Sequence, residues 1–247
     1  PIFVHTWEDK EDVANKLSKY DFLAMPVVDD EQRLVGIVTV DDAIDVLQDE
    51  ATEDIEKMAA ISPSSDKPYL KTGVFELFRA RIPWLLFLMI SATFTGTILT
   101  KFEDSLAVVP ALIAFIPMLM DTGGNSGGQA SVTIIRSLSL GDVEFRDIFR
   151  VIWKEMRVGI ICGVTLAAAN FVKILLIDRV TVPIALVVCL TLVVTVFTAK
   201  LIGCTLPLFA KKLGFDPAVM SSPFITTIVD ALSLLVYLEI ATIILGL

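Results

Sequence analysis

Cysteine and histidine are scarce in this chain, which has three cysteines and one histidine among its 247 residues. Cys162, Cys189 and Cys204 lie in apolar surroundings without a CxxC pair, so we interpret them as small buried hydrophobic residues and expect no disulfide framework or thiolate metal site. Positive charge is also scarce, because 20 Lys and Arg stand against 29 Asp and Glu. Without a basic patch to meet phosphates, no nucleic-acid partner is expected.

Hydrophobic residues, by contrast, are abundant, at 55% of the chain with a mean hydropathy of +0.74. The charged residues, 20% of the total, are concentrated in the first 81 positions, where they alternate with apolar residues as in a soluble domain. From residue 82 onward the chain is mostly apolar. We therefore predict a soluble part followed by a membrane part. Because the chain opens on Pro1 without a signal peptide, we expect it to be a piece of a longer protein.

The soluble part has the pattern of a small α/β module. Residues 8–19 have apolar positions at helical spacing, and two β-rich runs, 25–29 and 34–38, flank a polar tip that is typical of a hairpin. Thr39 then begins a second helix, and together with Asp42 it is close to a capping box. This order and the pattern PVVD…LVGIVT..DD resemble one CBS module. The resemblance implies that Thr39 and Asp42 hold the ribose of ATP or another adenine nucleotide; the alternative is that they only cap the helix.

An acidic run follows the module. Five carboxylates fall within two helical turns: Asp49, Glu50, Glu53, Asp54 and Glu56. Such a run is typical of a solvated helix face, but clustered carboxylates also repel one another, and Mg²⁺ or Ca²⁺ between them would relieve that repulsion. Residues 62–68, SPSSDKP, form a linker. The expected domains are a module at 1–48, an acidic connecting helix with linker at 49–81, and a membrane domain at 82–247.

The membrane part contains five apolar segments of about 20 residues or more, enough to cross a bilayer as helices. They are residues 82–100, 106–135, 152–177, 182–209 and 223–247. The second is longer than needed, and Pro110 and Pro117 offer places to bend. Lys and Arg gather before the first segment, between the second and third, and after the fourth. The positive-inside rule then places the N-terminal module in the cytoplasm and the C-terminus outside.

Polar residues interrupt the second segment in the run MLMDTGGNSGGQAS. Asp121, Asn125 and Gln129 are four residues apart, so they form one polar line along a helix. Glycines lie between them, and glycine permits either close helix packing or exposed backbone carbonyls. These glycines are Gly123, Gly124, Gly127 and Gly128.

The fifth segment repeats this spacing with Ser222, Thr226 and Asp230. The two hydroxyls can bond back to their own helix. A carboxylate among ITTIV and ALSLLVYL, however, needs a cation, a proton or a basic partner. Lys200 is one candidate for that partner; the alternative is that its side chain extends towards the inner membrane face. Glu239, nearer the end of the segment, is a second acid that the pattern does not explain.

Two polar lines with an aspartate each, glycine carbonyls and no basic lining predict a site for a hard cation such as Mg²⁺ or Ca²⁺. One carboxylate per chain would neutralise only half of the charge of a divalent ion. A symmetric dimer with two Asp230 side chains at a shared axis is therefore expected. Asn125 and the carbonyls near Gly124 and Gly128 would then bind the water shell of the ion.

Three runs resemble the MgtE family of magnesium channels over the whole chain: PMLMDTGGNSGGQAS followed by IR, TTIVDALSLLVYL, and EATEDI. The resemblance implies a homodimer in the cell membrane with five spans per subunit, and Asp230 as its central ion-binding residue. It also implies gating by cytoplasmic Mg²⁺, with the helix at 49–56 as a plug. The family's amino-terminal helical domain and first CBS module are absent from these residues.

We therefore expect a mainly α membrane protein that conducts Mg²⁺ and other divalent cations, surrounded by lipid, and not an enzyme. An ion-coupled secondary transporter is the alternative, although the five spans show no inverted repeat. An intramembrane aspartyl protease would also use two aspartates, but its Tyr-Asp and Gly-x-Gly-Asp motifs are missing around Asp121 and Asp230. A receptor-like protein leaves the polar lines unexplained.

Overall fold

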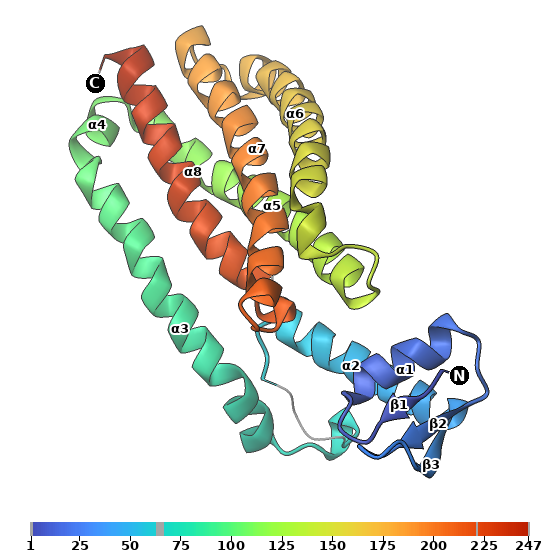
Figure 1. Cartoon of the computed structure of the whole chain (residues 1–247). Helices are drawn as coiled ribbons and strands as arrows, with labels where there is room; N and C mark the ends of the chain where they lie inside the picture. The colour runs from blue at the N-terminus through green and yellow to red at the C-terminus, as the bar shows by residue number, and fades with distance from the viewer. Residues whose placement is uncertain (1, 63–66, 221, 247) are drawn as a thin grey trace. The chain divides into compact units, whose positions relative to one another are not determined.

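The structure, a computed structural model, describes residues 2–62, 67–220 and 222–246, without the side chain of Ser222. Four residues of the expected linker, 63–66, thus lie outside the described residues. The chain divides into two compact units, Pro1–Glu56 and Lys57–Leu247. The first is a small α/β unit and the second is helical, so the predicted fold class is confirmed (Figure 1).

The first unit contains a three-stranded sheet with the strand order β1-β2-β3. Strand β1 (Val4–His5) pairs in parallel with β2 (Ala24–Val28), and β2 pairs antiparallel with β3 (Leu34–Thr39), which confirms the predicted hairpin. Helix α1 (Lys10–Lys19) begins after Asp9, whose side chain accepts a hydrogen bond from the backbone N–H of Glu11. The core of this unit is small and apolar, with Leu17 and Met25 among its fully buried side chains.

Helix α2 (Val40–Met58) includes both the last helix of the predicted module and the acidic run. The expected domain boundary at residues 48 and 49 therefore falls inside one continuous helix. No glycine or proline interrupts this stretch, and Ala, Leu, Glu and Gln favour a helix throughout it. Ala43 is the residue of α2 that is buried in the core of the module.

The second unit is built from long helices. Four of its helical stretches are long and apolar enough to cross a membrane. These stretches lie on α3 (Val74–Lys101), on α6 (Ile148–Lys173) with its flanking turns η3 (Phe145–Asp147) and η4 (Ile174–Asp178), on α7 (Val182–Lys212) and on α8 (Ser222–Leu245). The other short elements are η1 (Tyr69–Lys71) and η5 (Pro217–Val219).

The second predicted span is broken into three pieces, α4 (Glu103–Val108), η2 (Pro110–Phe115) and α5 (Ile116–Ser139). The break comes at Pro110, whose ring nitrogen has no hydrogen to donate to the preceding turn. Pro117, in contrast, lies in the first turn of α5, where no donor is needed. Helix α5 is long enough to span a bilayer but is not among the four apolar helices, because its centre holds the polar and glycine residues.

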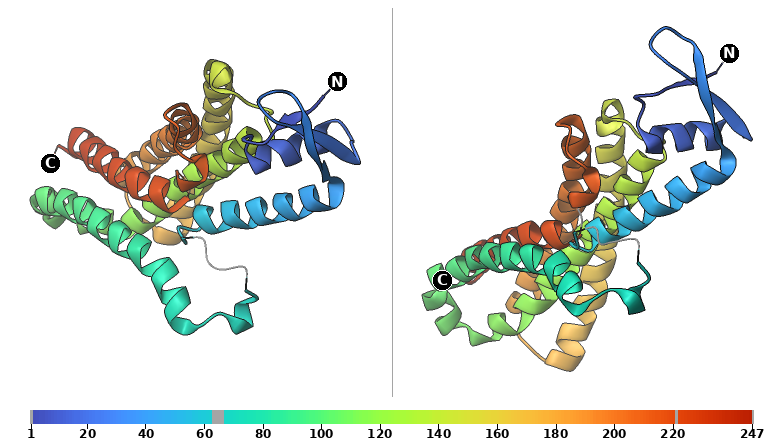
Figure 2. Two further views of the ribbon diagram at one scale, coloured as in Figure 1. Left: turned by 60° about the horizontal axis from the view of Figure 1, so that its bottom comes forward. Right: turned by 90° about the horizontal axis from the view of Figure 1, so that it is seen from below.

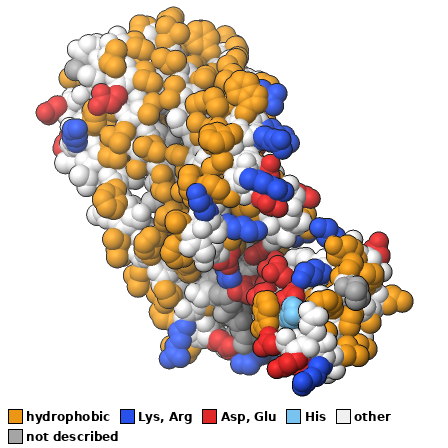
Figure 3. All heavy atoms as spheres, in the orientation of Figure 1, with side chains coloured by type: hydrophobic (Ala, Val, Ile, Leu, Met, Phe, Trp, Pro, Cys, Tyr) orange, Lys and Arg blue, Asp and Glu red, His pale blue; other side chains and the backbone are white. Residues whose placement is uncertain are grey.

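Helix α5 packs against both α7 and α8, α6 packs against α7, and α3 lies along α8 (Figures 1 and 2). On α3, large apolar side chains such as Phe87, Ile90 and Phe94 are exposed, and Ala80 is its one buried residue. Hydrophobic side chains also cover much of the helical unit on the face in Figure 3. An exposed surface of this kind suits lipid, not water.

Candidate ion-binding site

The predicted polar line of α5 exists and is exposed. Asp121, Asn125 and Gln129 are all exposed in the single chain, one helical turn apart. The glycines of the same segment lie on the opposite side, where Gly123, Gly124, Gly127 and Gly128 are buried. The helix thus packs its glycine face into the unit and presents its polar line outward. Within a membrane such a line must face water or another protein surface, since lipid satisfies no polar group.

The glycine face brings α5 close to α7 and α8. A methyl group placed on Gly124 would lie 2.8 Å from Cγ2 of Thr226, and one placed on Gly123 would lie 2.7 Å from Cγ2 of Thr195 and 2.9 Å from Oγ of Ser233. These distances are too short for a real side chain, so glycine is required for α5 to sit at this depth. The two helices that carry the predicted polar residues are therefore direct neighbours.

Further along the same face, the backbones of α5 and α7 are in direct contact. A methyl group on Gly203 of α7 would collide with the carbonyl oxygen of Gly127 and lie 3.0 Å from its carbonyl carbon. On the other side, a methyl group on Gly127 would lie 3.2 Å from the carbonyl oxygen of Ala199. In this structure Gly123, Gly124 and Gly127 of α5 serve helix packing, the first of the two uses that the sequence left open.

Asp230 of α8 is half-buried, and its Oδ1 atom is enclosed without a hydrogen-bond partner in the part of the chain that the structure describes. Enclosed carboxylate oxygens need a donor or a cation, because burial removes their water. A proton, or a hard cation with its bound water, would satisfy this oxygen.

Three hydroxyls near the same helices are also unpartnered among the described residues. Thr191, Thr195 and Ser233 are at most 3% exposed, and none of their hydroxyl oxygens has a hydrogen-bond partner there. Elsewhere on α7 the usual pattern holds, since the hydroxyls of Thr198 and Thr205 donate to carbonyls of their own helix at 2.8 and 2.7 Å. Ser233 follows Asp230 by one helical turn, so it contributes a hydroxyl beside the carboxylate.

Sequence reasoning did not select these hydroxyls. The signal that was available is their spacing, because Thr191 and Thr195 are four residues apart and Ser233 is three residues after Asp230. Of the residues that the sequence did select, Thr226 lies against Gly124, Gly128 is buried, and the side chain of Ser222 is outside the described residues. Glu239 is exposed towards the end of α8.

Lys200, the candidate partner of Asp230, is directed elsewhere. Its Nζ atom donates a hydrogen bond to Oε1 of Gln129 at 3.3 Å, and no ion pair with Asp230 is present among the described residues. The hydrogen-bonded partner is therefore the last residue of the polar line on α5.

In the first unit, the acidic run of α2 faces α1. Glu50 pairs with Lys10 at 3.0 Å, and Asp49 is exposed. Burial raises the pKa of the Glu11 carboxyl on α1, and the nearby charges of Glu50 and Asp54 raise this pKa further. Like charges are therefore gathered between the two helices. In the described residues, however, no group of three or more His, Cys, Asp or Glu is arranged to hold a metal ion.

The predicted nucleotide residues are close together. The Thr39 hydroxyl donates to Oδ2 of Asp42 at 3.0 Å where β3 passes into α2. Asp42 is exposed and Thr39 half-buried. This geometry suits the helix start, and it leaves the Asp42 carboxylate accessible.

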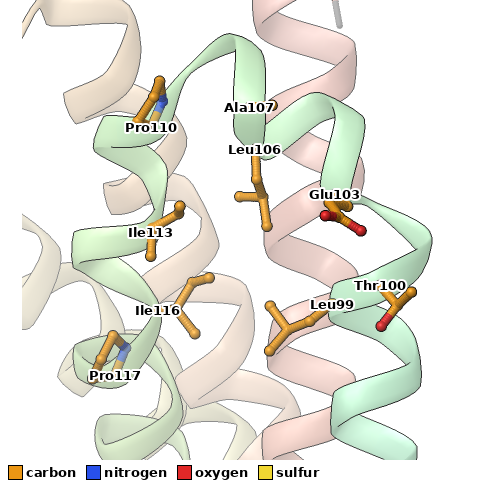
Figure 4. A pocket seen from close by; sticks show the side chains of 9 residues that line it. All are labelled: Leu99, Thr100, Glu103, Leu106, Ala107, Pro110, Ile113, Ile116 and Pro117. Carbon is orange, nitrogen blue, oxygen red and sulfur yellow. The ribbon is translucent and has the colours of Figure 1, made fainter.

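A pocket of about 680 Å³ lies away from the polar line, where α3 turns into α4 and η2 leads into α5 (Figure 4). Its walls are mostly hydrocarbon, and Glu103 is its one acidic residue. The lining residues are Leu99, Thr100, Glu103, Leu106, Ala107, Pro110, Ile113, Ile116 and Pro117. Neither Asp230 nor the polar line contributes to it.

Known proteins are similar to this sequence along nearly its whole length. A family model described as a divalent cation transporter, MgtE, matches residues 116–240, and a CBS-domain model matches residues 6–49. The chain is 44% identical to a magnesium transporter MgtE of Thermus thermophilus over 99% of its length. It is 39% identical over 95% of its length to the protein of that name from Bacillus subtilis, and 35% identical over 98% to that from Enterococcus faecalis.

The chain spans about half the length of these curated relatives, namely 54%, 51% and 52%. The membrane-family match contains α5 and most of α8, and so includes both polar lines. The CBS match contains most of the small first unit. By its sequence and by the helices that this sequence forms, the chain belongs to the MgtE family of divalent cation transporters.

Proposed function

We propose that two copies of this chain form a path for Mg²⁺ across the cell membrane, with Asp230 of each copy facing the ion. The observation that carries the proposal is the enclosed, unpartnered carboxylate oxygen of Asp230, on a helix packed against the helix of the exposed polar line. The magnesium transporters named among the relatives support the choice of ion. Transport, not catalysis, is the activity assigned.

The ion passes with its water in this proposal. Mg²⁺ gives up water reluctantly and is commonly held by one or two carboxylates while keeping several waters. Two Asp230 side chains would balance its charge, and Asn125, Thr226, Ser222 and the carbonyls near Gly124 and Gly128 would accept hydrogen bonds from its waters. Asp121 would add charge along the approach. The exposure of Asp121 and Asn125 in the single chain supports a second copy or water opposite them.

Mg²⁺ flux into liposomes tests the central residue. Asp230→Asn and Asp230→Ala are each expected to abolish flux while leaving the dimer intact, because either change removes the charge that balances the ion. Glu239→Gln is a matched control, since it neutralises another acid of the same helix that is exposed. Normal flux through the Asn variant would refute the assignment of Asp230.

An ion-coupled transporter is the second candidate, because a carboxylate path also serves exchange with H⁺ or Na⁺. The same liposomes distinguish the two. A channel carries Mg²⁺ down its own gradient at a rate that an imposed H⁺ or Na⁺ gradient does not change. A rate that rises severalfold with one of these gradients would identify coupled transport instead.

The acidic run of α2 is proposed to sense cytoplasmic Mg²⁺. Burial raises the pKa of Glu11, and the nearby charges of Glu50 and Asp54 raise it further; a divalent cation would relieve this second contribution, which supports the proposal. Millimolar Mg²⁺ is expected to protect the full-length protein from protease, and neutralising Glu50, Glu53 and Asp54 together is expected to remove that protection. Unchanged protection in the triple variant would leave the run, Asp49 included, as a solvated helix face.

The remaining proposals concern the module and the orientation. Thr39 and Asp42 are proposed to hold the ribose of an adenine nucleotide, so Thr39→Ala should weaken ATP binding to the full-length protein in equilibrium dialysis. Equal ATP binding by the variant would restrict the pair to its role at the start of α2.

The first unit is proposed to be cytoplasmic, and protease added to sealed right-side-out vesicles should then leave it intact.

A further inference from the structure

Lys200 is the one charged residue that is buried among the described residues, at 5% exposed. It lies on α7 in the middle of an apolar helix. Long cationic side chains near membrane surfaces usually extend their charge towards water. Lys200 does not, because its Nζ atom lies 3.3 Å from Oε1 of Gln129.

A glycine of α6 makes room for this side chain. A methyl group on Gly159 would lie 3.6 Å from both Cβ and Cγ of Lys200, and 3.3 Å from Cα of Phe197. Helix α6 therefore passes close to α7 at this level and covers the hydrocarbon stem of the lysine. The ammonium group emerges on the side of α5, where Gln129 ends the line that begins with Asp121.

The charge of Lys200 has little to balance it. An ammonium group has three donors, and the described structure supplies one acceptor, which belongs to a neutral amide. Burying a cation in this way is costly unless function retains it. Gln129 in turn has a single side-chain oxygen, the acceptor that a hydrated cation at this point of the line would use.

We propose that Lys200 is a tethered cation that competes with Mg²⁺ for the side-chain oxygen of Gln129. The inference rests on the proposed Mg²⁺ path along this line. When no ion is present, the ammonium group occupies the oxygen. An ion that arrives there has to displace it and meets its positive charge. Lys200 thereby weakens Mg²⁺ binding at the Gln129 end of the path and favours release of the ion, since conduction requires sites that bind weakly enough to let the ion leave.

The test measures the Mg²⁺ concentration that gives half-maximal flux in liposomes. Lys200→Met is expected to lower this concentration by about tenfold or more. The reason is that the repulsion energy between a unit charge and a divalent ion several ångströms away, in a partly buried site, is several times the thermal energy. Lys200→Arg keeps the charge and should remain close to the wild-type value. Lys211→Met is the matched control, because Lys211 lies on the same helix and its Nζ donates to the carbonyl of Leu138, away from the line.

Competition for one oxygen also predicts that the effects of changing Lys200 and Gln129 depend on each other. In a Gln129→Leu background, Lys200→Met should lower the half-maximal concentration by a smaller factor than in the wild-type background, because the shared acceptor is gone and only the repulsion between the ammonium charge and the ion remains. The same shift in that background, or an unchanged value for both Lys200→Met and Lys200→Gln in the wild-type background, would overturn the proposal. Absence of Mg²⁺ flux in the wild-type protein would instead refute the proposed function.

Discussion

The contact between Gly203 and Gly127 predicts a large difference between two chemically identical substitutions. Gly203→Ala drives its new methyl group into the backbone carbonyl of Gly127, and Ala130 Cβ, 3.1 Å away, blocks a sideways shift. Overpacking costs about 1–3 kcal/mol when side chains give way, and here the obstacle is backbone, so the upper end applies. Gly96→Ala on α3 meets no atom of the described residues within 4 Å and gains about 1 kcal/mol of helix propensity.

Thermal unfolding of the purified protein in detergent measures this difference. The two variants should differ by about 4 kcal/mol, which corresponds to a separation of roughly 8–16 °C for a chain of this size. Gly203→Ala is expected to melt below the wild-type protein and Gly96→Ala at or slightly above it. Equal midpoints would show that α5 and α7 are farther apart than the structure has them, and the argument for close glycine packing would fail.

Three further predictions concern single side chains. Asn125→Ala should weaken Mg²⁺ binding, measured by calorimetry, by less than Asp230→Ala does, because a neutral hydrogen bond contributes less than a charge-assisted one; an equal loss would contradict this order. Glu11→Gln should stabilise the first unit at pH 7, as measured by hydrogen exchange of α1. The pKa of Glu11 is raised in the folded state, so its ionised carboxylate destabilises the fold as pH rises through that pKa. The gain in stability should disappear in acid, and a gain that persists there would exclude the charge as its cause. Tyr237→Phe should lower the unfolding midpoint by a few degrees, because the buried hydroxyl donates to the Leu112 carbonyl at 2.9 Å and its loss costs about 1 kcal/mol; an unchanged midpoint would argue against that bond.

Much of the fold follows from the sequence because periodicity and turn residues act locally. The hairpin of β2 and β3 was predicted in the right place. Pro110 and Pro117 were both named as places to bend, and the break comes at Pro110. Helix starts were less accurate: α3 begins at Val74, eight residues before the apolar segment, because FELFRAR favours a helix outside the membrane as well. Hydropathy predicts where the apolar segment begins, whereas the helix extends beyond it because its backbone hydrogen bonds do not depend on the polarity of the side chains.

The sequence predicts which polar residues share a helix face, but not how those faces are arranged. Spacing alone placed Asp121, Asn125 and Gln129 on one line, but which way that line faces depends on how α5 is rotated against α7 and α8. The same limit applies to Lys200, for which the sequence offered Asp230 as a partner or extension towards the inner membrane face, and the structure shows Gln129 instead. A sequence records which residues share a face, whereas tertiary packing decides what that face meets.

The weak apolarity of α5 has a consequence for biosynthesis. Asp121, in the second turn of α5, opposes insertion of this helix by up to about 2.5–3.5 kcal/mol, the cost of an aspartate at a helix centre, so α5 is a poor candidate to enter the bilayer alone. Its glycine face is covered by α7 and α8, which leave the ribosome later. Helix α5 must therefore wait, shielded at the translocation machinery or the membrane surface, until its neighbours have been made. The order in which the helices enter the membrane then differs from their order in the chain.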